Sequence, residues 1–236
     1  MTSFPDDCIQ GLNDGDWWVK DETRAVNLGS LVWCHVQYFS QIPLQLVAER
    51  TVREDHEHAA LKAIPLSASG RKAAKETLPV AALPSLLDAD AYVVNRCKRR
   101  PCLVLGGANP SLVPKKDSLG MANWQTSPFF LVAPYYSADT GNRSGFPPAL
   151  VQKIRHAHFR QYFWDQLPLG SSKGSILRFD QTFPVGHEHA SFAPTGFRLG
   201  DQALFLLEQW LNWYLDGTLG DGELFAFKEL ISEEFS

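Results

Sequence analysis

Three short apolar segments near the middle of the chain each end in side chains that could bind a phosphate. They read RRPCLVL over residues 99–105, FFLVAPYYS over 129–137 and SILRFDQ over 175–181. Each has the length and apolar content of a buried strand, and each brings a charged or polar group to one end. A guanidinium can bind two oxygens of one phosphate at once. The pattern therefore predicts a small β-barrel with a cationic face that binds phosphate.

The net charge of −4 conceals a strong separation of charge along the chain. Residues 1–95 carry a balance of −5, residues 96–178 a balance of +9, and residues 179–236 a balance of −8. A basic centre between acidic flanks favours a polyanion bound at one face of a soluble protein. An alternative is that the acidic flanks pair with the centre and neutralise it.

Six of the seven histidines form His-x-His pairs, which are His56/His58, His156/His158 and His187/His189. If such a pair lies on a strand, its two histidines point to the same face of the sheet, because they are two residues apart. Two imidazoles on one face could bind one metal ion. This pattern leaves a metal-dependent hydrolase open as an alternative. His156 and His158 also lie close to Lys153, Arg155 and Arg160, where they could bind phosphate or act as acid and base.

Strand signals surround a segment of different character. Strands are expected at 28–39, 91–94, 102–105, 129–134, 149–154 and 174–179. Residues 41–90 are rich in Ala, Glu and Lys and cut by prolines, which predicts an insertion that forms either short helices or a hairpin. A helix is expected over 201–216, with Asp201 as its N-terminal cap and Gly217 just past its end. Its apolar side would be the stripe of Leu204, Leu207, Leu211 and Leu215. A short amphipathic segment follows at 222–231.

The composition and the N-terminal sequence restrict the kind of protein this chain can be. The 236 residues are 44% hydrophobic and 20% charged, which is ordinary for a globular chain with one sizeable core. No run approaches the length of a membrane-spanning helix, and the N-terminus lacks the pattern of a secretory signal, so we expect a cytoplasmic protein without a membrane partner. Cys8, Cys34, Cys97 and Cys102 show no metal-type spacing, and we expect free thiols.

The order of these segments resembles the PemK/MazF family of toxins from toxin–antitoxin systems. The opening LGSLVW (28–33), RPCLVL (100–105), VAPYYS (132–137) and SILRFDQ (175–181) are similar to successive strands of that family. The closing helix falls where the family has its C-terminal helix. The resemblance covers about residues 28–40 and 91–216. It implies an α+β, mainly β, fold: one SH3-like barrel domain spanning residues 1–236, with a C-terminal helix and the 41–90 segment inserted.

The resemblance also implies a function. It implies a metal-independent endoribonuclease without a cofactor, which cuts single-stranded RNA by attack of the 2′-hydroxyl on the adjacent phosphorus. An antitoxin protein and a second copy of the chain are the partners it implies. Arg100 would stabilise the phosphate charge, and Ser137 or Tyr136 would orient the phosphate. His156, His158 and His35 are the acid and base candidates, and Lys98, Arg99, Lys153, Arg155 and Arg160 would bind the RNA.

The chain departs from the family at one catalytic position. Tyr136 stands where the family has a threonine, and its hydroxyl reaches several ångströms further from the backbone. An alternative function is therefore a catalytically inactive module that keeps the fold and binds nucleic acid or protein. Asp180 and Gln181 match the family pattern, although an Asp-Gln at the end of a strand could also fix the turn.

Overall fold

The computed structural model describes residues 4–13, 15–38, 41–50, 52, 54, 58–66, 91–107, 127–138, 145–170, 173–187 and 191–234. They form two compact units. The first comprises residues 1–35 and 99–236, and the second comprises residues 36–98. The boundary falls inside two long strands, β2 (Ser30–Gln37) and β6 (Cys97–Gly107), which belong in part to each unit.

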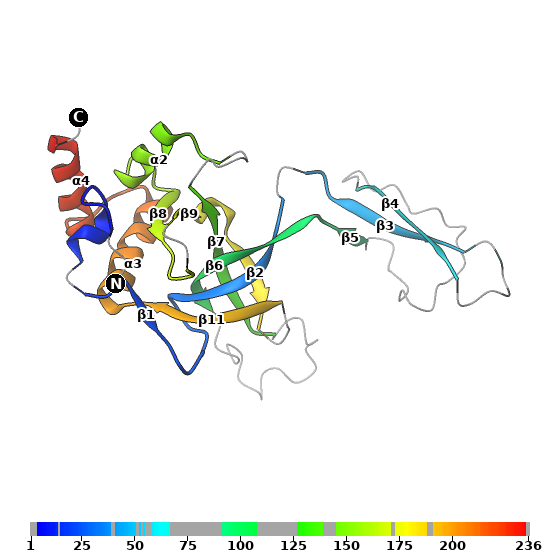
Figure 1. Cartoon of the computed structure of the whole chain (residues 1–236). Helices are drawn as coiled ribbons and strands as arrows, with labels where there is room; N and C mark the ends of the chain where they lie inside the picture. Colours follow the sequence, from blue (N-terminus) through cyan, green and yellow to red (C-terminus); the bar gives the residue numbers. More distant parts are fainter. Residues whose placement is uncertain are drawn as a thin grey trace. The chain divides into compact units, whose positions relative to one another are not determined.

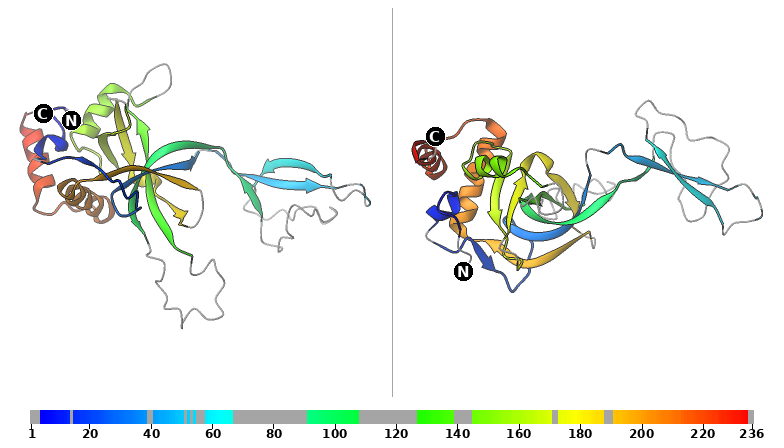
Figure 2. Two further views of the ribbon diagram at one scale, coloured as in Figure 1. Left: turned by 60° about the horizontal axis from the view of Figure 1, so that its bottom comes forward. Right: turned by 45° about the horizontal axis from the view of Figure 1, so that its top comes forward.

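The first unit is a curled antiparallel sheet with helices packed against it, so the chain has the expected mixed α+β, mainly β, character (Figure 1). The strands follow the order β1-β11-β2-β6-β7-β9-β8, and β10 pairs with β7. Figure 2 shows from two further directions that this sheet curls into a half-barrel. The remaining strands are β1 (Trp18–Lys20), β7 (Phe129–Ser137), β8 (Tyr162–Gln166), β9 (Gly174–Arg178), β10 (Phe183–Gly186) and β11 (Phe192–Leu199).

Four of the predicted strands are confirmed, as strands over 30–37, 97–107, 129–137 and 174–178. The expectation of a strand over 149–154 is wrong, because the helix α2 (Pro148–Arg155) occupies those residues. Pro148 stands in the first turn of α2, where a missing N–H costs no hydrogen bond. Two short 3₁₀ helices, η1 (Ile9–Leu12) and η2 (Phe179–Gln181), complete the connections.

The C-terminal helix α3 (Asp201–Asp216) confirms the expected helix, and α4 (Glu223–Glu234) follows it. Gly217 ends α3 in the left-handed conformation, with φ of 76°, as glycine does most readily. Asp201 does not cap α3, since the cap residue is Gly200 and no side chain fills that role. The buried stripe also differs from the leucine repeat: it comprises Ala203, Leu206, Leu207 and Trp210, whereas Leu215 is 67% exposed.

Two hydrophobic clusters lie on opposite faces of the strands β7, β9 and β8. The larger one joins Tyr135, Phe163 and Leu177 to α3 and α4, and Trp210 meets Phe163 edge to face at 4.8 Å. The smaller one joins Trp164 and Ile176 to residues of α2 and of the N-terminal segment. This second cluster explains the failed strand prediction, because the apolar side of α2 (Leu150, Val151 and Ile154) covers a sheet face.

The second unit contains a three-stranded antiparallel sheet in the order β4-β3-β5. Its strands are β3 (Leu44–Glu49), β4 (Ala60–Pro65) and β5 (Tyr92–Val94). Of the two structures considered for the inserted segment, the hairpin is present over these residues, with Leu44 opposite Pro65. Residues 67–90 of the insertion lie outside the described part.

Candidate nucleic-acid interface

The site centres on Arg100 and Tyr136, which face one another across β6 and β7. The register of these strands begins with Cys102 opposite Pro134. Continued by two residues along each strand, it brings Arg100 to the level of Tyr136. The guanidinium carbon of Arg100 lies 4.0 Å from the centre of the Tyr136 ring. Within the described part of the chain no carboxylate forms an ion pair with Arg100. Its in-plane N–H groups therefore remain able to bind an anion while the ring covers one face of the guanidinium.

A second pair of the same kind lies next to the first. Arg178 stands directly opposite Tyr162 across β9 and β8. Its guanidinium carbon lies 5.2 Å from the Tyr162 ring centre and 5.9 Å from the Tyr136 ring centre. The four side chains Arg100, Tyr136, Arg178 and Tyr162, here called the cation–aromatic strip, thus cross the neighbouring strands β6, β7, β9 and β8.

Asp180 and Gln181, which lie in η2, accept hydrogen bonds from two side chains of the strip. Two nitrogens of the Arg178 guanidinium contact the Asp180 carboxylate, with Nε donating to Oδ1 at 3.0 Å and Nη2 donating to Oδ2. The hydrogen bonds that Arg178 donates to the Asp180 carboxylate raise the pKa of Arg178. The Tyr136 hydroxyl donates to Oε1 of Gln181. The Asp-Gln pair therefore does more than fix a turn, because it orients one cation and one ring of the strip.

The Tyr136 hydroxyl is a donor and not a base at neutral pH. Burial raises the pKa of Tyr136, although the charges of Arg100 and Arg178 oppose that shift. Ser137 follows at the exposed end of β7, paired with Ser175. At the far end of the strip, Phe146 and Phe159 each meet Tyr162 edge to face with ring centres 6.1 Å apart.

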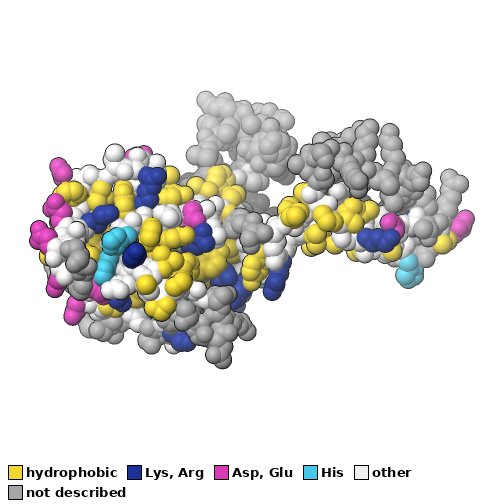
Figure 3. Space-filling model, turned by 90° about the horizontal axis from the view of Figure 1, so that it is seen from above, with side chains coloured by type: hydrophobic (Ala, Val, Ile, Leu, Met, Phe, Trp, Pro, Cys, Tyr) yellow, Lys and Arg dark blue, Asp and Glu magenta, His cyan; other side chains and the backbone are white. Residues whose placement is uncertain are grey.

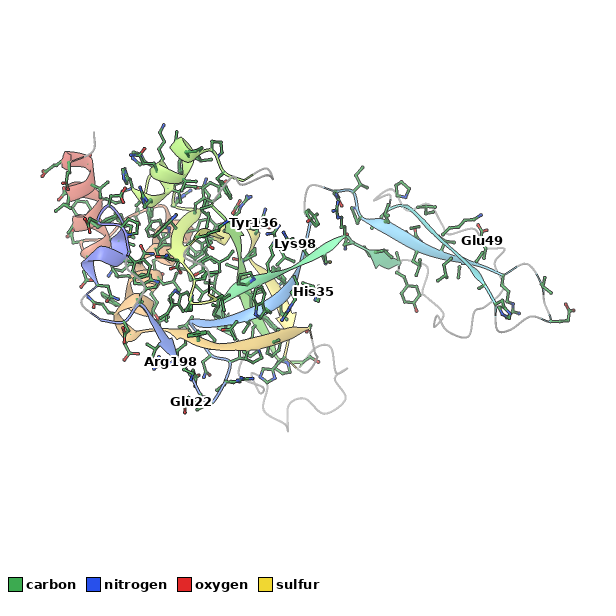
Figure 4. All side chains as sticks on the ribbon, viewed as in Figure 1. Glu22, His35, Glu49, Lys98, Tyr136 and Arg198 are labelled. Carbon is green, nitrogen blue, oxygen red and sulfur yellow. The ribbon has the colours of Figure 1, made fainter. Side chains whose placement is uncertain are left out.

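Arg99 and His35 lie on the opposite face of the sheet from Arg100. Successive residues of a strand point to opposite faces, and Arg99 lies over Trp33 with its guanidinium carbon 4.7 Å from the ring. His35 shares the face of Trp33, two residues away on β2, and is exposed. Figure 4 labels both His35 and Tyr136. The sheet thus separates His35 from the strip. Lys98 is exposed on β6 and belongs to the second unit.

The histidines of the basic centre form a different cluster, at the end of α2. The Asp7 carboxylate contacts Nε2 of His156 at 2.9 Å and Nη2 of Arg155 at 2.7 Å. His156 is buried, whereas His158 is exposed, and their ring centres are 6.5 Å apart. Burial lowers the pKa of His158, and the charges of His156 and Lys228 act in the same direction.

Lys153 and Arg160 are exposed beside this cluster. Because Asp7 engages both His156 and Arg155, these two side chains join the N-terminal segment to α2. Figure 3 shows basic side chains spread over the first unit and acidic side chains gathered at the end that carries α4. The charge separation of the sequence is thus visible on the surface as well.

The described residues include no group of three His, Cys, Asp or Glu side chains placed to hold a metal ion. His56 and His189 lie outside the described residues, so two of the three His-x-His pairs have only one described member each. His156 and His158 follow the end of α2 and are not on a strand, so the face-sharing geometry expected for a strand pair does not apply to them.

Sequence reasoning missed Tyr162 and Asp165, which both lie on β8. No pattern in the sequence marks Tyr162 as a site residue, because its role depends on the strand register that puts it opposite Arg178. Asp165 is fully buried in the core and accepts a hydrogen bond from the Tyr135 hydroxyl at 2.9 Å. A single carboxylate inside the run Tyr-Phe-Trp-Asp is the kind of signal that would have marked it, since buried charges are rare unless bonded.

Comparison of the chain with models of protein families, with curated proteins and with solved structures found no match. Among the helices of the described residues, none has the length and apolar character needed to cross a membrane.

Proposed function

We propose that the chain binds single-stranded RNA along the cation–aromatic strip. The observation that carries the proposal is the alternation of two guanidinium groups with two phenol rings across four neighbouring strands. Proteins that bind single strands combine cations that follow the phosphates with aromatic rings on which bases stack. The strip offers both kinds of group within one face of a sheet.

The basic balance of residues 96–178 supports the same proposal. Arg100 lies in the segment that resembles the RPxLVL strand of PemK/MazF toxins, where the arginine contacts the scissile phosphate. The absence of an ion pair for Arg100 among the described residues suits that role, since a phosphate would not need to displace a carboxylate. An SH3-like toxin fold, an antitoxin partner and a homodimer are further proposals that come with the resemblance.

Cleavage of the bound RNA is a second candidate, and the position of Arg100 favours it. A guanidinium there could stabilise the charge that develops as a 2′-hydroxyl attacks phosphorus. The surroundings of Tyr136 favour binding without cleavage, because its hydroxyl already donates to Gln181. Two of the candidates for proton transfer are also away from the strip. His35 lies on the opposite face of the sheet, and His156 contacts Asp7. We therefore place binding first.

The experiment measures binding of a fluorescent single-stranded RNA oligonucleotide by anisotropy at several salt concentrations. Arg100→Ala should weaken binding about tenfold or more and lower the salt slope by about one, because one phosphate contact is lost. Tyr136→Ala should weaken it by a similar factor through loss of a stacking ring. Arg198→Ala is the matched control, because Arg198 lies on β11 and bonds to Asp201 and the Leu199 carbonyl (Figure 4).

Failure of the wild-type chain to bind at low salt would refute the proposal, as would an equal loss in Arg198→Ala. The same samples, followed on gels, decide between binding and cleavage. If Tyr136 has replaced a catalytic threonine in an inactive module, the wild type leaves the RNA intact and Tyr136→Thr raises cleavage. If the wild type cleaves and Tyr136→Thr slows it, the tyrosine takes part in the reaction.

A further inference from the structure

A cavity of about 580 Å³ lies between one side of α3 and the loop that joins α3 to α4. Four side chains of α3 line it, at intervals of four, three and four residues, and these are Phe205, Gln209, Asn212 and Asp216. This spacing places them in one stripe, on the side of α3 opposite the buried stripe that packs in the core. Residues 218–222 and Glu223, at the start of α4, form the other wall. The volume is within the range of about 300–1,000 Å³ that is usual for ligand pockets.

The loop is held against α3 by specific contacts, so the cavity is built into the fold. The Leu224 N–H donates to Oε1 of Gln209 at 3.3 Å. Gly222 approaches the same side chain so closely that a Cβ at this position would lie 2.7 Å from Oε1. A larger residue at 222 would therefore push the Gln209 amide away from Leu224. On the other side of the loop, Leu219 packs against the larger hydrophobic cluster.

The lining of the cavity combines exposed apolar surface with negative charge. Phe205 is 52% exposed, and Leu219 is half-buried beside it in the lining. Asp216, Asp221 and Glu223 contribute three carboxylates. Among the described residues that line the cavity, none is Lys, Arg or His. A ligand of this cavity must therefore carry positive charge next to an apolar group.

The three carboxylates have no cationic partner within the part of the chain that the structure describes. Arg160 approaches the same loop, with Nη1 against Gly217, but it forms no ion pair with Asp216 and does not line the cavity. These carboxylates also do not form a group that could hold one metal ion. They are instead placed to contact separate positive groups of a larger cation.

We propose that this cavity is a docking site for a basic peptide segment of a partner protein, which inserts an arginine side chain. The guanidinium plane can stack on the exposed Phe205 ring, and the aliphatic stem can cover Leu219. Its N–H groups can then bind a carboxylate in the bidentate manner that a lysine cannot match. Neighbouring basic residues of the segment would contact the remaining carboxylates.

The charge of this end of the molecule complements such a partner. Residues 179–236 carry a balance of −8, and Figure 3 shows acidic side chains gathered at the end that carries α4. Complementary charge directs a partner to one surface and suppresses binding of partners with the same sign. The site is separate from the cation–aromatic strip, because α3 and α4 pack on the face of the sheet that carries Tyr135, whereas the strip includes Tyr136 on the other face.

The test measures binding of a short fluorescein-labelled peptide of arginine, glycine and serine to the full chain by anisotropy. We expect binding that weakens as salt is added, and no binding of the same peptide with citrulline in place of arginine. Asp216→Asn together with Asp221→Asn should lower the affinity about tenfold or more, through loss of charge-assisted hydrogen bonds. Glu229→Gln together with Glu233→Gln is the matched control: it removes the same charge from exposed positions of α4 outside the cavity and should change the affinity less than about twofold.

A further variant fills the site from within the chain. Asn212 is exposed, so Asn212→Arg should leave the melting temperature unchanged while its own guanidinium competes for the carboxylates and blocks the peptide. Unimpaired peptide binding by this variant would count against the site.

Three other results would overturn the proposal: no binding of the arginine peptide at low salt, equal losses in the two double variants, or equal binding of the citrulline peptide. Spermine that binds as tightly as the peptide, with the same loss in the Asp216/Asp221 variant, would assign the cavity to a small polyamine and overturn the peptide assignment. RNA binding is measured on the same samples and should be equal in all of them. If the wild type binds no RNA, the proposed function fails while the peptide result still decides this site.

Discussion

Replacement of Asp165 by asparagine should remove a pH dependence from the stability of the first unit. The Asp165 carboxylate is fully buried and accepts hydrogen bonds from the backbone N–H of Gln166 at 2.7 Å, the Tyr135 hydroxyl at 2.9 Å and the Trp18 indole at 3.3 Å. Burial raises the pKa of Asp165 to about 6, although these hydrogen bonds favour the charged form and oppose the shift. The bonds are therefore too few to offset the loss of solvation.

The sign and the size follow from linkage. The folded state retains the Asp165 proton up to about pH 6, whereas the unfolded chain releases it near the ordinary value of 3.8. Protonation therefore stabilises the fold below pH 4, and that contribution is lost as the pH rises to about 6. At 1.36 kcal/mol for each pKa unit, the loss is about 3 kcal/mol. Asparagine does not titrate, so Asp165→Asn should gain about 3 kcal/mol relative to the wild type between pH 4 and pH 7.

Urea unfolding followed by tryptophan fluorescence measures this difference. The six tryptophans among the described residues all belong to the first unit, so the signal reports chiefly on that unit. Asparagine can keep its oxygen toward Gln166 and Trp18 and donate its N–H₂ to the Tyr135 oxygen, which makes it a fair mimic of the protonated acid. Tyr135→Phe removes a donor to the carboxylate and should move the pH-dependent loss to higher pH. Parallel stability curves for Asp165→Asn and the wild type from pH 4 to 7 would refute the reasoning.

Two further predictions concern the cluster at α2 and the metal hypothesis. Asp7→Ala should lower the free energy of unfolding by about 2 kcal/mol, because Arg155 and the buried His156 lose their shared carboxylate; the exposed neighbour, in Asp6→Ala, should change it little, and equal effects would count against the contact. A chelator should leave the melting temperature of the wild type unchanged, since the proposed chemistry needs no ion. A fall of several degrees, with metal found by elemental analysis at one per chain, would instead support a His-x-His site.

Local patterns in the sequence were enough to predict several elements of the fold. The strands around residues 30–37, 100–105 and 129–137 have β-branched and aromatic side chains in short runs, and helix 201–216 has an apolar periodicity ending at a glycine. The apolar run of segment 149–154 is too short to distinguish the period of a strand from that of a helix, and for this reason the sequence alone wrongly favours a strand there. Its conformation depends on Trp164 and Ile176, which are distant in sequence and present the face that α2 covers.

For the candidate site, residue types and their order along the chain were sufficient to select Arg100, Tyr136 and the Asp180–Gln181 pair. The way in which these side chains combine depends on the fold. The strand register brings Arg178 opposite Tyr162, and η2 turns Asp180 toward Arg178 and Gln181 toward Tyr136. The fold also separates two of the candidate histidines from the strip, because His156 contacts Asp7 and His35 lies on the other face of the sheet. A one-residue change of register reverses the face of every side chain in a strand, and register is set by pairing and core packing across the whole sheet.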